Sequence, residues 1–285
     1  KQTQQWLALH QRYSPSRTDD NCGAIYEQSF NAVARTIQAE KLHVIGLGCG
    51  GGQKDSRLIA RLERGGNKVF YTPCDVAPAM VLTARRTALS VLPDNRIYPL
   101  VCDLQTANDL RGAIHLSRNQ KLRRIITFFG MIPNFEPDEI LPKLASLIRR
   151  KDVLLFSANL APGDDYAIGT GRILPQYNND QTRDWLLTFL IDLGIAKNDG
   201  ALLFDIENTR HDLKRIRARF RFKRACQITI DNEAFGFKAG ELIRLFFSYR
   251  YRPDRMLDLL ASHGLKAHQQ WITKSGEEGV FVCSK

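Results

Sequence analysis

The glycines between positions 46 and 52 have the spacing that most clearly suggests chemistry. They occur in the run Gly46-Leu-Gly48-Cys-Gly50-Gly51-Gly52, between an apolar segment at 42–46 and a predicted helix at 56–64. Glycine lets the backbone turn tightly and approach a ligand closely, and the start of a helix favours an anionic group. The run therefore predicts a loop that holds a nucleotide-like cofactor.

Two aspartates are predicted to lie beside this loop. Asp75 ends the next apolar segment, where a carboxylate can accept hydrogen bonds from both hydroxyls of a ribose. Asp103 ends the third segment, so we expect it near the base of the same nucleoside. Ligands of open α/β sheets bind at the carboxyl edge of the strands. The alternative is a tight turn flanked by two solvated aspartates.

The elements that would position these residues alternate regularly. Tyr26, Phe30, Val33 and Ile37 share one face of a predicted helix at 24–39, and Asp55 is a candidate N-cap for the helix at 56–64. Further helices are expected at 78–90 and from Pro137. This alternation predicts a parallel, doubly wound α/β sheet. Its strands are expected at 42–46, 68–73, 97–101, where Pro99 predicts an interrupted or edge strand, 124–129 and 153–157.

The rhythm changes after Ala161. A helix is predicted at 181–197 and antiparallel strands at 216–250, followed by a helix at 253–263 and two terminal strands that can form a hairpin. We therefore expect an α/β domain at 24–160, completed by 251–285. An α+β substrate-binding insertion is expected at 161–250, with 1–23 packing on it.

Composition limits the possible classes of protein. The 285 residues are 44% hydrophobic, and no apolar run approaches the roughly 20 residues of a membrane span. The beginning of the sequence lacks the apolar core of a secretion signal. The six cysteines form no C-x-x-C pair or zinc-type spacing, which favours reduced thiols in a cytoplasmic protein without a bound metal.

A net charge of +11 favours anionic partners, and residues 210–224 include eight lysines or arginines. This run could bind RNA or an acidic substrate. Alternatively, it is a strand face paired with Asp205, Glu207 and Asp212. We favour the second interpretation because its aromatic residues alternate with the charges and form no stacking platform.

Six segments contain motifs that can be compared with known families. In chain order, they are Arg12-Tyr13-Ser-Pro-Ser-Arg17, Gly46-Leu-Gly-Cys-Gly-Gly-Gly-Gln-Lys54-Asp55, Tyr71-Thr-Pro-Cys-Asp75-Val-Ala77, Phe128-Phe-Gly-Met-Ile-Pro-Asn134-Phe-Glu-Pro137, Tyr177-Asn-Asn-Asp180 and Leu245-Phe246-Phe-Ser248-Tyr-Arg-Tyr-Arg-Pro253. Together they resemble the histidine-specific methyltransferase family, whose typical member methylates the α-nitrogen of L-histidine.

The resemblance implies a Rossmann-like class I methyltransferase fold that uses S-adenosyl-L-methionine (SAM) to methylate a small molecule. The expected acceptor is the nitrogen of an amino acid or a related amine. Asn134 and Tyr177 would act as catalytic residues that orient this amine. The residues implied to bind the cofactor are Gly46, Gly48, Gly50, Lys54, Asp75 and Asp103, and those implied to bind the substrate are Tyr13, Asn134, Tyr177, Phe246 and Ser248.

One residue departs from the family pattern. The family has a glutamate that grips the imidazole ring of histidine, and Phe246 stands at that position. A phenyl ring cannot accept this hydrogen bond, which disfavours histidine as the substrate. An RNA methyltransferase and a catalytically silent SAM-binding protein remain alternatives. A nicotinamide oxidoreductase is a more distant one, since no Tyr-x-x-x-Lys pair is present.

Overall fold

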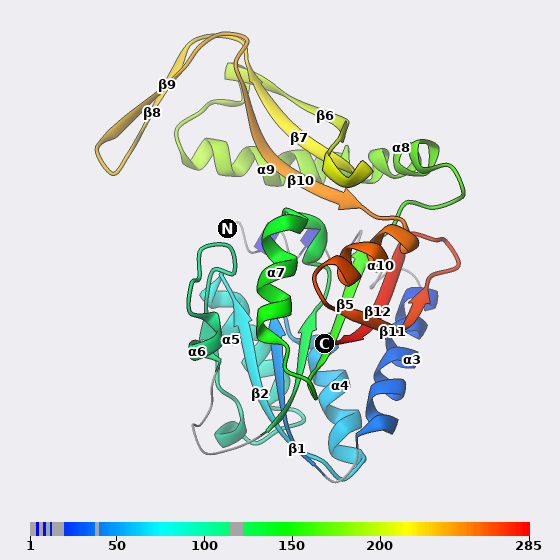
Figure 1. Ribbon diagram of the computed structural model, residues 1–285. Coiled ribbons are helices and arrows are strands. Elements are labelled where there is room, and N and C mark those ends of the chain that lie inside the picture. The colour runs from blue at the N-terminus through cyan, green and yellow to red at the C-terminus, as the bar shows by residue number, and fades with distance from the viewer. Residues whose placement is uncertain (1–3, 6–7, 10–11, 13–19, 38–39, 115–121) are drawn as a thin grey trace. The chain divides into compact units, whose positions relative to one another are not determined.

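The computed structural model describes residues 4–5, 8–9, 12, 20–37, 40–114 and 122–285 (Figure 1). The chain divides into two compact units. The first unit joins the described residues of Asp19–Leu160 to Arg252–Lys285, and the second unit contains Ala161–Tyr251. The expected packing of residues 1–23 on the insertion falls largely on residues outside the described ranges, so it stays a prediction.

In the first unit, seven strands of the described chain form one sheet in the order β11-β12-β5-β4-β1-β2-β3. Neighbours among β1 to β5 run parallel, whereas β12 runs antiparallel to β5 and β11. The predicted doubly wound sheet is therefore confirmed, and it ends in the expected terminal hairpin. The strands are β1 (Lys41–Leu47), β2 (Lys68–Asp75), β3 (Leu100–Val101), β4 (Arg123–Phe128), β5 (Val153–Asn159), β11 (Lys266–Ile272) and β12 (Glu278–Ser284).

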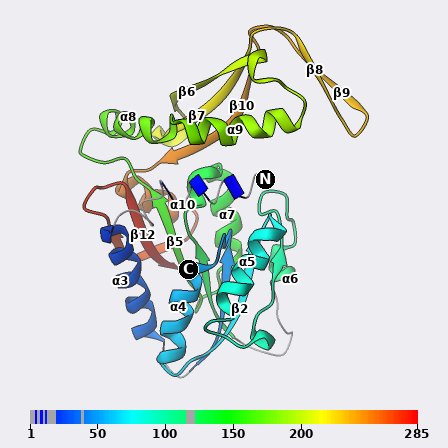
Figure 2. The ribbon, with the colours of Figure 1, turned by 180° about the vertical axis from the view of Figure 1, so that it is seen from behind.

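Helices cover both faces of this sheet. In Figures 1 and 2, α3, α4 and α5 lie on one face, and α7 and α10 lie on the other. Pro78, Pro137 and Pro253 each stand at the first position of a helix, where a missing N–H group costs nothing. The helices are α3 (Asp20–Thr36), α4 (Gln53–Arg64), α5 (Pro78–Ala88), the short α6 (Leu110–Ala113), α7 (Pro137–Leu147) and α10 (Pro253–Ser262).

The core of the first unit follows the predicted helical face. Tyr26, Phe30 and Val33 of α3 are at most 2% exposed, as is Ile37 just beyond the helix, and they join the buried cluster that contains Leu42 of β1. Each such buried side chain contributes about 1.5–3 kcal/mol relative to full exposure. This burial fixes α3 and α4 against the sheet and so sets the position of the loop that joins β1 to α4.

The third strand is shorter than the predicted segment at 97–101. Only Leu100 and Val101 form β3, and Ile97 makes an isolated bridge to Tyr71. Pro99 lies between these two contacts and has no N–H to donate, so the pairing is interrupted as predicted.

The second unit is built from antiparallel strands and two helices. Its sheet has the order β10-β7-β6, and β8 pairs with β9 as a separate hairpin. The predicted helix at 181–197 is correct in kind but ends earlier, at Asp192, while α8 and β6 were not predicted. The elements are α8 (Tyr166–Tyr177), α9 (Asp180–Asp192), β6 (Gly200–Asn208), β7 (Lys214–Phe222), β8 (Cys226–Ile230), β9 (Glu233–Phe237) and β10 (Leu242–Arg250).

A separate apolar core holds the second unit together. Leu186 and Leu190 of α9 pack with Ala218, Phe220 and Phe222 of β7. These strand residues alternate along one face, as successive side chains of a strand must.

Candidate functional site

The loop from Gly46 to Gly52 leaves β1 at the carboxyl edge of the sheet. The Cys49 N–H donates to the Cys74 carbonyl of β2 at 3.0 Å, and the Gly52 N–H donates to the Cys49 carbonyl at 2.9 Å. Gly52 has a φ of 73° and directly precedes α4, a left-handed conformation that favours glycine. The loop is therefore a tight turn whose backbone is fixed by hydrogen bonds to the neighbouring strand.

Asp75 turns its carboxylate toward this loop. Its Oδ2 accepts a hydrogen bond from the Gly50 N–H at 3.1 Å, and its Oδ1 accepts one from the Ala77 N–H at 3.0 Å. An ionised carboxylate offers about four acceptor sites, so each oxygen retains capacity for a further donor. The position of Asp75 suits the predicted role of accepting hydrogen bonds from ribose hydroxyls.

Asp103 lies close to Asp75 in the fold. The Cys102 N–H donates to the Asp75 carbonyl at 3.0 Å, which joins the ends of the two strands. The exposed Asp103 carboxylate accepts hydrogen bonds from the Gln105 N–H at 2.8 Å and the Thr106 hydroxyl at 3.0 Å. The structure thus brings both predicted aspartates to the same edge as the glycine loop.

Asp55 corrects the sequence-based assignment. The prediction that it caps a helix at 56–64 is wrong, because α4 begins at Gln53 and Asp55 lies in its first turn. Its carboxylate is 2% exposed and accepts hydrogen bonds from the Tyr71 and Thr127 hydroxyls, both at 2.7 Å. Burial raises the pKa of Asp55, and these two hydrogen bonds oppose the rise.

Gly46 is required by this buried carboxylate. A Cβ atom at Gly46 would lie 2.1 Å from the Oδ2 of Asp55, which is far inside van der Waals contact. The sequence indicated Gly46 as part of a cofactor loop. The structure adds a packing reason for glycine at this position.

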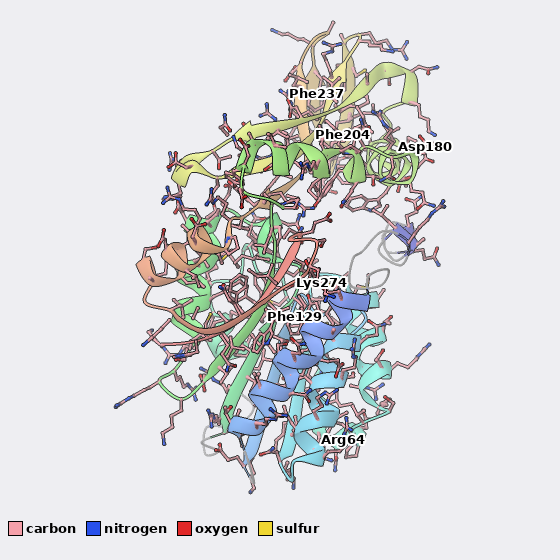
Figure 3. All side chains as sticks on the ribbon, turned by 90° about the vertical axis from the view of Figure 1, so that its right-hand side faces the viewer. Arg64, Phe129, Asp180, Phe204, Phe237 and Lys274 are labelled. Atoms are coloured by element: carbon pink, nitrogen blue, oxygen red, sulfur yellow. The ribbon has the colours of Figure 1, made fainter. Side chains whose placement is uncertain are left out.

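Lys54 is the second residue of α4. Its Nζ donates to the Tyr26 hydroxyl at 2.8 Å and lies 4.1 Å from the centroid of the Tyr26 ring. The ring of Phe129 stands edge-on to the same tyrosine, with 5.3 Å between ring centroids, beside α3 (Figure 3). The assignment of Lys54 to the cofactor stays a prediction.

Asn134 follows β4, at the end of a short 3₁₀ helix, Ile132–Asn134. Its side chain is exposed, and the turn that leads to it is anchored where the Gly130 N–H donates to the Ser157 hydroxyl at 2.8 Å. Met131, in the same turn, packs on the glycine loop, because a Cβ atom at Gly48 would lie 2.5 Å from the Met131 Cγ. Sequence reasoning missed this contact, since no local pattern links residues so far apart.

Three thiols lie at the same edge. Cys49, Cys74 and Cys102 are free, and burial raises the pKa of Cys74 to about 12 and that of Cys49 still further. Both groups therefore stay protonated near neutral pH, which supports the interpretation that they are packing groups and not nucleophiles.

In the second unit, Tyr177 ends α8 and contacts β10. Its hydroxyl donates to the Ser248 Oγ at 3.0 Å and accepts a hydrogen bond from the Arg250 guanidinium at 2.7 Å. Ser248 is 1% exposed and Arg250 is 5% exposed. The structure thus joins the predicted pair Tyr177 and Ser248 and adds Arg250, which the sequence did not indicate.

Phe246 lies two residues before Ser248 on β10. Its ring centroid is 5.8 Å from that of Tyr177 and 6.1 Å from that of Trp185. Tyr177 is therefore flanked by an apolar ring as well as by polar groups. Tyr13, the remaining predicted substrate residue, lies outside the described residues.

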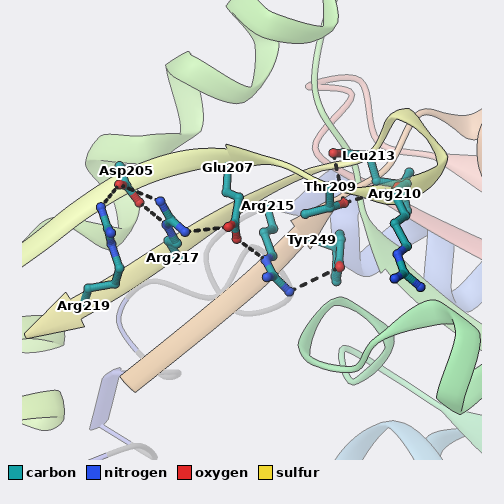
Figure 4. Close-up of polar contacts among 9 residues, drawn as sticks. All are labelled: Asp205, Glu207, Thr209, Arg210, Leu213, Arg215, Arg217, Arg219 and Tyr249. Carbon is teal, nitrogen blue, oxygen red and sulfur yellow. Dashed lines mark hydrogen bonds and ion pairs between the residues drawn. The ribbon is translucent and has the colours of Figure 1, made fainter. Parts of the chain in front are cut away.

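Part of the basic run at 210–224 forms ion pairs with Asp205 and Glu207 (Figure 4). Arg217 contacts Asp205 at 2.6 Å and Glu207 at 2.5 Å, while Arg215 contacts Glu207 at 2.7 Å and Arg219 contacts Asp205. The interpretation of a paired strand face is confirmed for Asp205 and Glu207. The inward alternation of Phe220 and Phe222 is confirmed by their burial.

The described residues contain neither a candidate membrane span nor a candidate metal site. No helix among them is both long enough and apolar enough to cross a bilayer. No group of three or more His, Cys, Asp or Glu side chains in the described ranges is arranged to hold a metal ion.

The chain is similar to known proteins in sequence and to solved structures in fold. The N-methyltransferase imqF of Aspergillus flavus is 23% identical over 279 residues, which span 95% of this chain and 74% of that protein. A solved structure described as a possible exported protein of Bordetella parapertussis gives a TM-score of 0.51 at 10% identity, covering 91% of this chain and 66% of that one. The magnesium protoporphyrin IX methyltransferase of Synechocystis PCC 6803, solved with bound SAH, gives a TM-score of 0.45 at 14% identity, covering 98% of this chain and 92% of that one. The Bordetella structure shows a shared fold alone.

The family comparison is decisive because it spans both units. The family model described as histidine-specific methyltransferase, SAM-dependent, matches residues 10–285 of this chain. The predicted SAM-dependent methyltransferase activity and the predicted cofactor are therefore confirmed. The predicted doubly wound α/β sheet is the one observed. The chain belongs to the SAM-dependent, histidine-specific methyltransferase family.

Proposed function

We propose that this methyltransferase acts on the amine nitrogen of an amino acid or a related small molecule, and that histidine is not its preferred substrate. The family match and the N-methyltransferase relative support a small nitrogen acceptor. The observation that carries the proposal is the Tyr177 hydroxyl, held between Ser248 and Arg250 with Phe246 beside it.

The glycine loop fits SAM. Gly48 and Gly50 have φ values of 62° and 51°, so side chains there would strain the turn, and Asp75 retains acceptor capacity beside them. Gly46, Gly48, Gly50, Asp75 and Asp103 would hold the nucleoside, and Lys54 would meet the carboxylate. When bound, SAM supplies an electron-poor methyl carbon.

On the acceptor side, Tyr177 can orient an amine. Its hydroxyl donates to Ser248 and accepts from Arg250, which fixes the direction of the phenol oxygen, and in the proposed role this oxygen would accept an amine N–H. The amide oxygen of Asn134 has the same capacity. Residues that hold the hydrogens of an amine would leave its nitrogen lone pair for the methyl carbon, and such positioning is a main source of rate in a displacement reaction.

Phe246 sets the expected substrate preference. A phenyl ring offers no acceptor for an imidazole N–H, and a buried polar group left unpaired is strongly disfavoured. We therefore expect side chains that pack on an aromatic ring to be preferred over that of histidine.

A labelled-methyl screen tests the proposal. Purified protein is incubated with methyl-labelled SAM and a panel of amino acids, their derivatives and RNA, and the methylated atom is assigned by NMR. The expected result is label on an amine nitrogen, with histidine a poor acceptor. Asp75→Asn should weaken SAM binding in calorimetry by more than about 100-fold, since hydrogen bonds to a charged group contribute about 1.5–3 kcal/mol each.

Other outcomes would reject parts of the proposal. Cofactor binding with no product on any acceptor would indicate a silent SAM-binding protein, and label on RNA alone would indicate a nucleic-acid methyltransferase. Histidine as the best acceptor would show that the inference from Phe246 is wrong.

We also propose a cytoplasmic location. All six cysteines are free thiols. Free thiols in this number are typical of a reducing compartment. Cell fractionation with an antibody to the chain tests this proposal, and recovery from an oxidising compartment would contradict it.

A further inference from the structure

Glu278 is a buried carboxylate that the proposed chemistry does not use. It is the first residue of β12, which pairs with the end of β5 at the carboxyl edge of the sheet, and it is 6% exposed. One of its oxygens accepts a hydrogen bond from the Tyr26 hydroxyl, and the other accepts one from the Cys22 thiol at 3.2 Å. Burying a charged group is costly unless it is paired, so this carboxylate calls for an explanation.

The hydrogen bonds around Glu278 run in one direction. The Lys54 ammonium donates to the Tyr26 oxygen at 2.8 Å, and the Tyr26 hydroxyl in turn donates to Glu278. Burial, and then the charge of Glu278, raise the pKa of Tyr26 well above its usual value. The phenol therefore keeps its proton and links the ammonium to the carboxylate across the whole neutral range.

The surroundings restrict the ammonium to one place. The Lys54 Nζ lies 4.1 Å from the centroid of the Tyr26 ring and 5.8 Å from that of Phe129. Tyr26 itself is 1% exposed, and its hydroxyl is hydrogen bonded to the buried Glu278. Neither the ring nor the hydroxyl can move far, so both fix the lysine.

The location of this lysine requires a negative charge nearby. Lys54 lies in the first turn of α4, directly after the glycine loop, and the positive end of the helix dipole disfavours a cation there. The negative charge of Glu278, coupled through Tyr26, offsets this cost. The arrangement thus keeps an ammonium group beside a loop whose shape suits a cofactor with an amino-acid moiety.

We propose that Tyr26 and Glu278 are positioning residues that aim Lys54 at the carboxylate of the cofactor's amino-acid moiety. This inference rests on the proposed function, because it assumes that the Gly46–Gly52 loop holds SAM. It assigns a ligand-related role to two residues from distant parts of the chain, Tyr26 on α3 and Glu278 on β12.

Two ligands can distinguish a positioning role of Tyr26 from a general effect on the stability of the protein. S-adenosylhomocysteine carries the amino-acid carboxylate, whereas 5′-methylthioadenosine has the same nucleoside and thioether without it. Calorimetry with both ligands is performed on the full chain and on Tyr26→Phe, which retains the ring and removes the hydroxyl. We expect the affinity for S-adenosylhomocysteine to fall about tenfold, the value of one hydrogen bond to a charged group, and that for methylthioadenosine to stay unchanged.

Further variants keep the test decisive. Lys54→Met should show the same selective loss, and the double variant should lose little more than either single one, because the residues act as one unit. Glu278→Gln, which keeps the shape of the side chain, serves if Tyr26→Phe folds poorly. Tyr71→Phe is the matched control, since it removes another buried hydroxyl of the same unit that donates to Asp55 and not to the Lys54 chain.

The outcomes distinguish the inference from the function beneath it. If Tyr26→Phe and Glu278→Gln leave both affinities unchanged, or weaken both ligands equally as a general destabilisation would, the positioning role is wrong while SAM binding stands. If the unaltered chain binds neither ligand, the cofactor site itself is wrong and the inference fails with it.

Discussion

The two units hold their predicted functional groups in different ways. In the first unit, Asp75 and the glycine loop meet at strand ends and are joined through backbone N–H groups. In the second unit, Tyr177, Ser248 and Arg250 contact one another through side chains alone. A site built on the backbone depends on where strands end, whereas a site built on side chains depends on each residue. Under the proposed assignment of residues, the first unit would fix the cofactor, and the second unit could change its acceptor by single substitutions.

The largest effect is expected where the backbone of the first unit is packed most closely. Gly46→Ala places a Cβ atom 2.1 Å from the Asp55 Oδ2 and 3.2 Å from the Tyr71 hydroxyl, and both of these groups are buried. Such overpacking should lower the free energy of unfolding by about 2–3 kcal/mol. Urea denaturation followed by circular dichroism measures the change.

Gly51→Ala is the matched control in the same loop. Its Cβ atom would meet the side-chain amide of Gln53, at 2.6 Å from Nε2, and that flexible group can move away. The expected cost is below about 1 kcal/mol. If the two variants lost equal amounts of unfolding free energy, close packing against the backbone at Gly46 would not be the cause of the loss.

The first unit could be predicted largely from sequence. Apolar segments bounded by glycine, proline and aspartate located β1, β2, β4 and β5, because the same local features that end a strand also place a residue at the sheet edge. Asp55 could not be predicted in this way. Its partners Tyr71 and Thr127 are 16 and 72 residues away, and only the folded sheet brings their hydroxyls under the loop.

The second unit was harder to predict. Helix α8 contains Gly169, Gly171 and Pro175, which lower the helical propensity of the segment, and tertiary packing overrides that preference. Arg250 was missed for another reason: its contact with Tyr177 spans 73 residues, and a lone arginine in a strand has no pattern that marks it. The resemblance identified Tyr177 and Ser248, and the geometry shows that they touch.

A smaller and more selective effect is expected at Tyr177. Tyr177→Phe keeps the ring contact with Phe246 but removes the hydroxyl that joins Ser248 to Arg250. We expect kcat/KM for the amine acceptor to fall about tenfold, the value of one hydrogen bond, with the affinity for S-adenosylhomocysteine unchanged. Steady-state kinetics and calorimetry on the same preparation measure both. A parallel loss of cofactor affinity would contradict the proposal that the first unit binds the cofactor and the second unit binds the acceptor.

The smallest effect is expected in the charged face of the second unit. Asp205 accepts hydrogen bonds from Arg217 and Arg219 (Figure 4). Burial raises the pKa of Asp205, but the hydrogen bond and charge of Arg217, together with Arg219, outweigh it and hold the pKa below its usual value. The carboxylate is about one-third exposed, so Asp205→Asn should cost less than about 1 kcal/mol of stability near neutral pH.

The sign of the pH dependence follows from the lowered pKa of Asp205. The unfolded chain takes up this proton near pH 4, before the folded chain does, so the stabilisation is complete above that pH and is lost as the pH falls through the folded value. The difference in unfolding free energy between the unaltered chain and Asp205→Asn should therefore shrink below about pH 4. Arg221→Gln, at an exposed position on the same strand, is the control. If this difference in unfolding free energy stays constant with pH, the paired face contributes through packing and not through charge. The side chains of the second unit would then stabilise it by packing, as those around Gly46 do in the first unit.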